Sequence, residues 1–151
     1  MFKVIENIRQ GMPIEICGEK HSVQTKTLYV TATEKNNWYA KFVMEDHSVL
    51  VIAPFDDFMY FGRIHNIFGD GDMFQDVLEY DGHIYEKQAE DYQIVKQLVF
   101  GDATVAEGEV HYADYGCDDN EDYTISLALV SRTKTRADII AKIITLDDIK
   151  W

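Results

Sequence analysis

The chain has 151 residues, of which 46% are hydrophobic and 13% aromatic. This length and composition give a core large enough to fold without a disulfide or metal. The formal net charge is -13, from 27 acidic and 14 basic residues. Nucleic acid and anionic membranes are polyanions, so this charge argues against both as partners.

Other features of the composition indicate a cytoplasmic protein. The two cysteines, Cys17 and Cys117, are too few for a disulfide framework, so we expect both thiols to be reduced. The N-terminal residues lack the apolar region of a signal peptide. The longest uncharged apolar run, 48–55, is too short to cross a bilayer.

The first predicted element is a helix over 2–10. Val4, Ile5 and Ile8 share one face of it, and Gly11 ends it. Almost everything after this helix is predicted to be strand, because Val, Ile, Tyr, Phe and Thr recur in runs bounded by charged or glycine-containing turns. Gly62 lies inside one of these runs, which indicates a bulge or a close approach of another backbone. The predicted strands are 14–17, 21–33, 38–44, 49–53, 58–64, 76–80, 83–88, 92–100, 107–115 and 123–131.

The strongest local signal is the pair Asp81-Gly82 between two aromatic runs. A two-residue hairpin turn of type I′ needs positive φ at both central residues, which Asp-Gly supplies. We therefore predict a hairpin between 76–80 and 83–88.

Segment 137–146 is ambiguous. Its isoleucines have helical spacing, but isoleucine is β-branched and favours a strand, so we predict a strand. The resulting fold class is mostly β, with two curved antiparallel sheets or half-barrels and a short N-terminal helix. Residues 1–151 form a single domain, or two β-rich halves joined near 66–76, a loop rich in glycine and aspartate.

No motif for a nucleotide, a nucleophile or a metal is complete. Two acidic loops, beginning at Asp70 and at Asp118, start like calcium loops but lack the required glycine and ligand positions. His111, Asp114 and Cys117 are the densest local set of donors, one short of the four that tetrahedral zinc needs. We therefore expect neither a metal nor a cofactor.

Two groups of residues are candidates for binding. The aromatic residues Trp38, Tyr39, Tyr60 and Phe61 are able to form a groove for a peptide, although such residues also serve as core and cross-strand pairs. In an extended chain Arg132, Lys134 and Arg136 would point to one side and bind a phosphate or an acidic surface, while a charged turn is the alternative.

Four segments resemble a bacterial domain of unknown function, the family numbered 4178. They are WYAK (38–41), YFGR (60–63), LEYDGHIY (78–85) and AEGEVHYADY (106–115). The resemblance implies a β-rich cytosolic protein without an assigned activity. It carries over no catalytic residue.

Together these observations favour a non-enzymatic cytoplasmic binding or assembly module. Its expected partner is another protein or a second copy of the chain in a homodimer. Two alternatives stay open: a hydrolase-like enzyme with an acidic site assembled from non-local residues, and an acidic inhibitor or immunity-type protein. Separately, Glu107 and Glu109 lie on one strand face with His111 and form a carboxylate pair of the kind that general acid–base catalysis uses. A cleft with convergent polar groups of perturbed pKa would favour the enzyme, and a flat apolar face the binding module.

Overall fold

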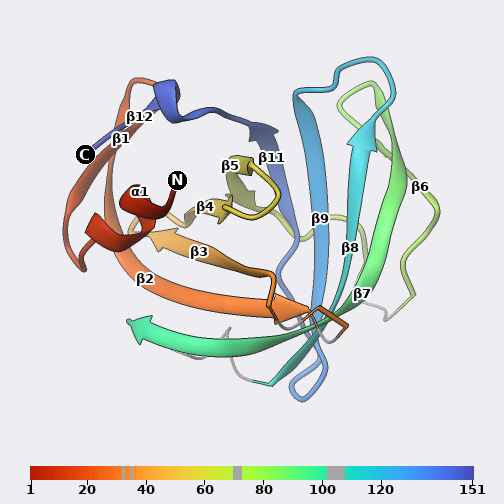
Figure 1. Cartoon of the computed structure of the whole chain (residues 1–151). Coiled ribbons are helices and arrows are strands. Elements are labelled where there is room, and N and C mark those ends of the chain that lie inside the picture. The colour runs from red at the N-terminus through yellow and green to blue at the C-terminus, as the bar shows by residue number, and fades with distance from the viewer. Residues whose placement is uncertain (32, 35, 70–72, 102–107) are drawn as a thin grey trace.

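The computed structural model describes residues 1–31, 33, 34, 36–69, 73–101 and 108–151. These residues form one short α-helix, a single 3₁₀ turn and twelve strands (Figure 1). The elements of the first half are α1 (Phe2–Asn7), β1 (Pro13–Ile16), β2 (Glu19–Thr31), β3 (Trp38–Met44), β4 (Ser48–Ala53), β5 (Phe58–Ile64) and β6 (Val77–Tyr80). Those of the second half are β7 (His83–Phe100), β8 (Glu109–Cys117), β9 (Tyr123–Val130), β10 (Thr135–Arg136), β11 (Ile139–Ile143), η1 (Leu146–Asp148) and β12 (Ile149–Lys150).

Eight strands of the described chain close into a ring. They pair in the order β2-β3-β4-β5-β11-β9-β8-β7, and β7 then pairs with β2. The closing register runs from Lys26 opposite Phe100 to Thr31 opposite Gln93, and Figure 1 shows β2 and β7 side by side. All of these pairings are antiparallel. The strands β1, β12, β6 and β10 add to the sheet outside the ring.

The two longest strands make the closure geometrically feasible. The register of β2 against β7 shifts at two places, and that of β7 against β8 shifts between Lys87 and Ala89. Such irregularities bend a strand and increase its twist. The bends let β2 pair with β1, β3 and β7, and let β7 pair with β6, β8 and β2. The sheet is therefore continuous across both halves of the chain.

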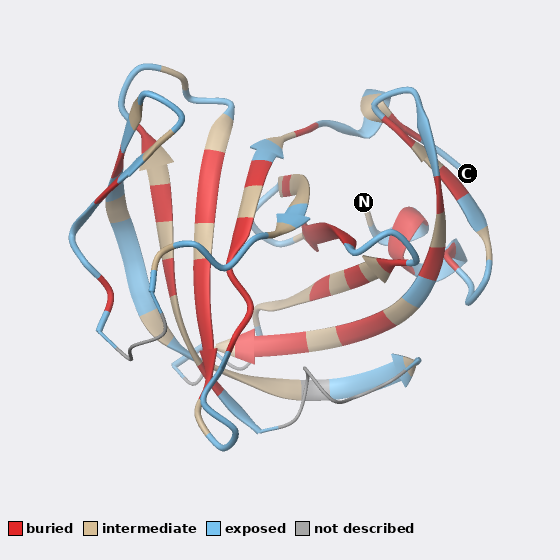
Figure 2. Cartoon of the chain, turned by 180° about the vertical axis from the view of Figure 1, so that it is seen from behind, coloured by how far each residue is buried: buried red, intermediate tan, exposed pale blue. Residues whose placement is uncertain are grey.

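The outward faces of the ring carry two separate apolar cores. Val4, Ile5 and Ile8 of the α1 region are buried against Phe42 and Ile52, the outward side chains of β3 and β4. A second core lies outside β8 and β9, where Phe74 and Leu78 cover Tyr115 and Leu127. Figure 2 shows buried residues running along the ring strands, while the end of β7 is largely exposed. With both outer faces covered, the inner face of the ring is left to define an interior.

Much of the predicted fold is confirmed. The protein is mostly β, with a short N-terminal helix whose predicted apolar face is buried. Asp81 and Gly82 have φ of 50° and 78°, as the hairpin turn requires, and the ambiguous C-terminal segment contains the strand β11. Of the described helices, none has the length and apolar character needed to span a membrane.

Some boundaries were predicted incorrectly. The N-terminal helix was expected to reach residue 10, but it ends at Asn7, because Ile8 is already extended with a ψ of 127°. Residues 83–88 and 92–100 were expected to be separate strands, but they belong to the single strand β7. Glu90 and Asp91 lie between the two predicted strands, and both residue types are depleted in strands. They are tolerated within the strand because Glu90 lies on the outward face beside Lys87 and His111.

Candidate functional site

The ring encloses a cavity of about 160 Å³. Every one of the eight ring strands contributes at least one side chain to its wall, which places the cavity in the interior of the ring. The wall is formed by Thr31, Tyr39, Lys41, Val51, Ala53, Phe58, Tyr60, Gln93, Tyr112, Asp114, Ser126, Ala128 and Ile139 of the strands, with Asn37, Asp56 and Ala137 beside them. Small closed sheets of eight strands either fill this space with side chains or hold one small ligand there.

The alternation of side chains along β3 explains how polar groups reach the interior. Ala40 and Phe42 are fully buried in the outer core. Because successive side chains of a strand point to opposite faces, Tyr39 and Lys41 point inward and line the cavity. Both faces of β3 are therefore covered, one by apolar packing and the other by the opposite wall of the ring.

Lys41 is the only cationic side chain among the described residues of the cavity wall. Its ammonium group makes no hydrogen bond or ion pair with any described residue. Desolvation by burial lowers the pKa of Lys41 to about 8. Such a depression is expected for an amine that loses water without gaining a counter-ion. A charge of this kind destabilises the folded protein when no ligand is bound. It is therefore available to pair with an anionic ligand.

A hydrogen-bonded group lies on a different part of the wall. The Ser126 hydroxyl on β9 hydrogen-bonds with the phenol of Tyr60 on β5 and with the carboxyl group of Asp114 on β8. Burial raises the pKa of Asp114, an effect that the bond from Ser126 partly opposes. Burial also raises the pKa of Tyr60, with a further contribution from the nearby Asp114 charge. These residues offer both donors and acceptors to a molecule in the cavity.

Further tyrosines complete the polar wall. The Tyr39 hydroxyl donates a hydrogen bond to the side-chain oxygen of Gln93 on β7, and its ring stacks on Tyr29 at 5.4 Å between ring centroids. Burial raises the pKa of Tyr29 and that of Tyr112 to about 12. The phenols therefore stay neutral at physiological pH and act as hydrogen-bonding groups.

Two turns border one end of the cavity. Asn37 follows the turn between β2 and β3, Asp56 lies in the turn between β4 and β5, and both belong to the wall. The Asn37 amide donates to the Asp56 carboxylate at 3.4 Å. Lys41 is four residues further along β3, which is roughly 13 Å along the strand at 3.3 Å per residue.

The structure does not bring the four predicted aromatic residues together. Tyr39 and Tyr60 meet in the cavity. Trp38 points the other way, with its ring in edge contact with Phe2 and Phe55, and the Phe61 ring meets His21. A single groove made by all four is therefore not formed.

The predicted basic cluster is not formed either. Residues 131–134 make a turn in which Lys134 has a φ of 57°, so the chain is not extended here. Arg136 is buried and forms a two-pronged pair with Asp138, with Nε–Oδ1 and Nη2–Oδ2 distances of 2.9 Å. Its guanidinium also lies over the Phe74 ring at 5.1 Å. Arg132 and Lys134 stay on the surface, which is the charged-turn alternative.

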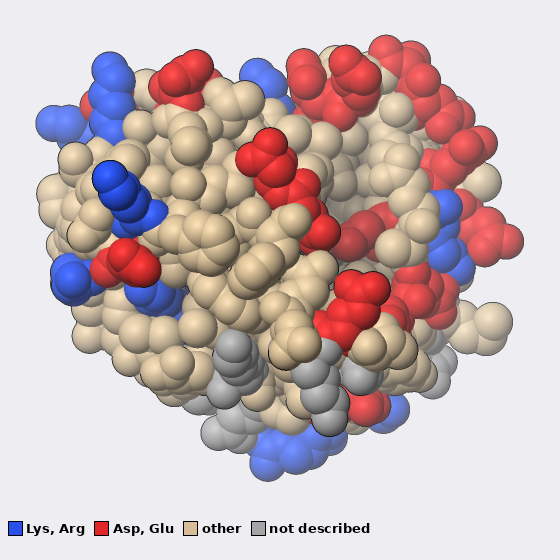
Figure 3. Space-filling model, in the orientation of Figure 1, with Lys and Arg blue, Asp and Glu red and all other residues tan. Residues whose placement is uncertain are grey.

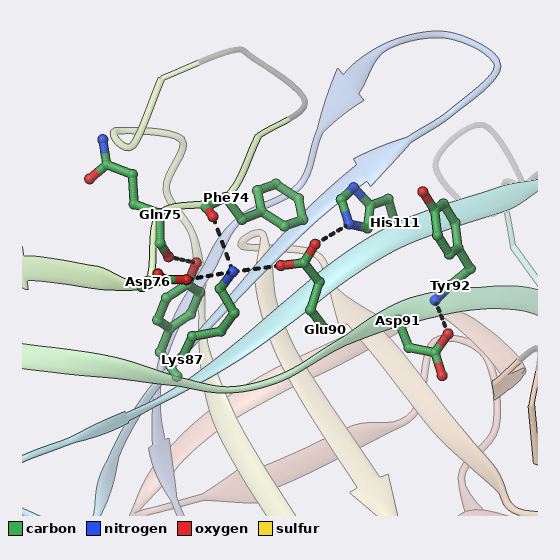
Figure 4. Close-up of polar contacts among 9 residues, drawn as sticks. Phe74, Gln75, Asp76, Lys87, Glu90, Asp91, Tyr92 and His111 are labelled. Carbon is green, nitrogen blue, oxygen red and sulfur yellow. Dashed lines mark hydrogen bonds and ion pairs between the residues drawn. The ribbon is translucent and has the colours of Figure 1, made fainter.

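A cluster of charged groups on the outer face of the ring holds the segment before β6 in place (Figure 4). Lys87 on β7 donates to the Phe74 carbonyl at 3.2 Å and pairs with Asp76 at 3.2 Å and with Glu90 at 2.6 Å. Glu90 also meets His111 at 2.9 Å. Each charged group here already has a partner, so the cluster acts as a structural clamp.

The donors that lie closest along the sequence are not close in space. His111 stacks between Phe74 and Tyr92 on the outer face, whereas Asp114 lines the interior cavity. Cys117 instead lies beside His83 and Asp119. Of the acidic candidates for catalysis, Glu109 is exposed and Glu107 lies outside the described residues, as does Asp70 of the first acidic loop.

Sequence reasoning missed Lys41, Gln93 and Ser126 as site residues, and it considered Asp114 only as a metal donor beside His111 and Cys117. A signal for Lys41 was present. It lies between Tyr39 and Val43 on the same strand face, and a lysine is unusual on a face that is otherwise apolar. Asp114 and Ser126 gave no such signal, because their partners are distant in the sequence.

No family model, curated protein or solved structure matches this chain. The function therefore has to be inferred from the geometry of the site.

Proposed function

We propose that the protein binds a small organic acid inside the ring. The observation that carries this proposal is the ammonium of Lys41, which has no partner among the described residues, in a cavity walled by side chains from all eight ring strands. A buried charge is normally paired, and a carboxylate in the cavity would supply the missing partner.

The size and chemistry of the cavity narrow the ligand. A cavity of about 150 Å³ accommodates a molecule the size of benzene, which is close to the 160 Å³ found here. Lys41 on β3 and Asp114 on β8 lie on different walls, since three strand steps separate them in one direction around the ring and five in the other. A one-ring carboxylic acid with a hydroxyl group at its far end satisfies both walls.

Binding is tested with benzoate and 4-hydroxybenzoate, against the neutral analogues benzamide and benzyl alcohol, by isothermal titration calorimetry and thermal shift. We expect the acids to bind at least tenfold more tightly than their neutral analogues at pH 7. This preference should disappear in Lys41→Met. The matched control is Lys20→Met, which replaces an exposed lysine on β2. Equal binding of acids by wild type and Lys41→Met, or no binding by any of the acids, would contradict the proposal.

The pH dependence gives a second test. An anionic ligand binds the ammonium form of Lys41, whose pKa in the free protein is about 8. Affinity for benzoate should therefore be constant between roughly pH 6 and 7, where the ligand is fully ionised, and fall about tenfold for each pH unit well above 8.

A second candidate function is an enzyme of the hydrolase type. The observation in its favour is the half-buried Asp114, whose pKa is raised by desolvation and which hydrogen-bonds with Ser126 close to Tyr60, since general acids are often made this way. Hydrolysis of p-nitrophenyl acetate by wild type and by Asp114→Asn decides between the two. Turnover that depends on Asp114 would establish the enzyme, and its absence would leave binding alone.

A further inference from the structure

Three donor side chains of different chemistry meet at one end of the sheet, away from the cavity. His83 opens β7, Cys117 ends β8 and Asp119 follows in the β8–β9 turn. Their donor atoms all lie within 4.8 Å of one another. His83 Nδ1 is 2.7 Å from Asp119 Oδ1, and the Cys117 thiol donates to the same oxygen at 3.0 Å.

The fold fixes these three residues in place. Cys117 is paired with Tyr85 across the β7–β8 ladder, two residues from His83. The backbone N–H of Asp118 donates to the Ile84 carbonyl at 2.9 Å, which ties the start of the turn to β7. The Tyr123 ring packs edge-on against the His83 ring at 5.4 Å. Local order therefore exists before any ligand arrives.

We propose that His83, Cys117 and Asp119 bind a zinc ion. Imidazole, thiolate and carboxylate are all zinc ligands, and thiolate disfavours calcium and magnesium. At Zn–S and Zn–N distances of 2.3 and about 2.05 Å, tetrahedral ligand atoms lie about 3.5 Å apart. Two of the observed donor distances, 2.7 and 3.0 Å, are shorter than this value, and the third is no more than 4.8 Å, so binding requires only small side-chain movements. The ion replaces the thiol proton, which is released to solvent as the Zn–S bond forms.

The surroundings suit a cation with an exchangeable fourth ligand. His83 also lines a second hollow, bounded by Tyr80, Asp81, Tyr85 and Tyr123. The strands and turns that carry the three donors also carry exposed carboxylates: Glu79, Asp81, Glu86, Asp118, Glu121 and Asp122. Figure 3 shows acidic side chains gathered on the side of the molecule that carries the β6–β7 and β8–β9 turns. Three protein ligands beside an open hollow are the arrangement in which zinc keeps a water or substrate as its fourth ligand.

Sequence inspection predicted no metal because it considered ligands near one another in the chain. His83 and Cys117 come from different strands, and only the antiparallel pairing of β7 with β8 brings them together.

The test is titration of chelator-treated, full-length protein with cobalt(II), which takes tetrahedral zinc sites and reports thiolate ligation by a charge-transfer band. We expect one ion per chain, a thiolate band, and displacement of cobalt by zinc. Cys117→Ser should abolish the band, while Cys17→Ser, at the exposed thiol, should keep it. Asp119→Asn should weaken zinc binding about tenfold or more, and its neighbour Asp118→Asn should bind normally.

Circular dichroism identifies any variant that fails to fold. Asp119 is exposed, so Asp119→Asn keeps the proposal testable even if Cys117→Ser is unstable. A missing thiolate band in folded wild type would overturn the proposal, as would a band that persists in Cys117→Ser or equal zinc binding by Asp119→Asn and Asp118→Asn.

Discussion

Replacing Lys41 by methionine should stabilise the protein. Methionine has nearly the length of lysine without its charge, so the change removes the desolvated ammonium and keeps the packing. Burial shifts the pKa of Lys41 from 10.5 to about 8, and each pKa unit corresponds to 1.36 kcal/mol. Lys41 is only half-buried, so its charge keeps part of its hydration and destabilises the folded state by at most roughly 3 kcal/mol at neutral pH.

The expected gain for Lys41→Met at pH 7 is about 1–3 kcal/mol, since loss of favourable contacts of the lysine offsets part of the benefit. For a chain of this size each kcal/mol raises Tm by roughly 2–4 °C. Urea unfolding at pH 7, followed by circular dichroism, measures the free energy directly. Lys20→Met, on the surface of β2, should change it by less than about 0.5 kcal/mol.

The sign of the pH dependence follows from the same shift. Between pH 8 and 10.5 folded Lys41 is neutral while unfolded Lys41 still binds a proton, so wild-type stability rises with pH. The advantage of Lys41→Met should therefore shrink over this interval. Ionisation of tyrosines above pH 10 is common to both proteins and cancels in the difference. A Lys41→Met variant that is less stable than wild type, with the same pH profile, would refute the interior placement of this charge.

Four further predictions concern the framework and association. A Cβ on Gly62 would lie 2.1 Å from the Ile140 carbonyl oxygen, so Gly62→Ala should cost about 1–3 kcal/mol or more in urea unfolding; Gly116→Ala, which meets only the movable Gln88 side chain, should cost less. Gly82→Val should cost about 1–2 kcal/mol because it places a β-branched residue at positive φ; an unchanged melting curve would argue against the turn. Arg136→Met should cost about 3–5 kcal/mol because it leaves the buried carboxylate of Asp138 unpaired. A homodimer remains a prediction. Sedimentation at two ionic strengths should show that the fraction of dimer rises with salt if burial of apolar surface drives association, and a monomer at both ionic strengths would exclude the dimer.

Local features of the fold were predictable from the sequence. The strands of the first half and the Asp81-Gly82 turn follow from patterns within a few residues of one another. The close approach at Gly62 was also predicted, because a glycine weakens a strand interior and is typically found there where a bulge or a neighbouring backbone leaves no room for a side chain.

Closure of the ring was not predictable in the same way. It depends on β2 pairing with β7 and on β11 lying between β5 and β9, and periodicity within a strand does not identify its neighbours. For the same reason the sequence showed that Tyr39 and Lys41 share a face without showing that this face is the interior. The buried pair of Arg136 with Asp138 could have been predicted from the sequence. Asp138 is two residues further on and lies on the same side of an extended chain, so its carboxylate was a local signal for this pair.

The position of β11 has a consequence for how the protein reaches its native state. This strand is made after both of its neighbours, β5 and β9, and it fills the gap between them. Until residue 143 has left the ribosome, both of those edges lack their partner, and the apolar β5 is open to other chains. Long-range pairings of this kind fold slowly and expose aggregation-prone edges. The nascent protein should therefore depend on chaperones until β11 is in place. A chain that stops before residue 139 should aggregate rather than form a smaller ring.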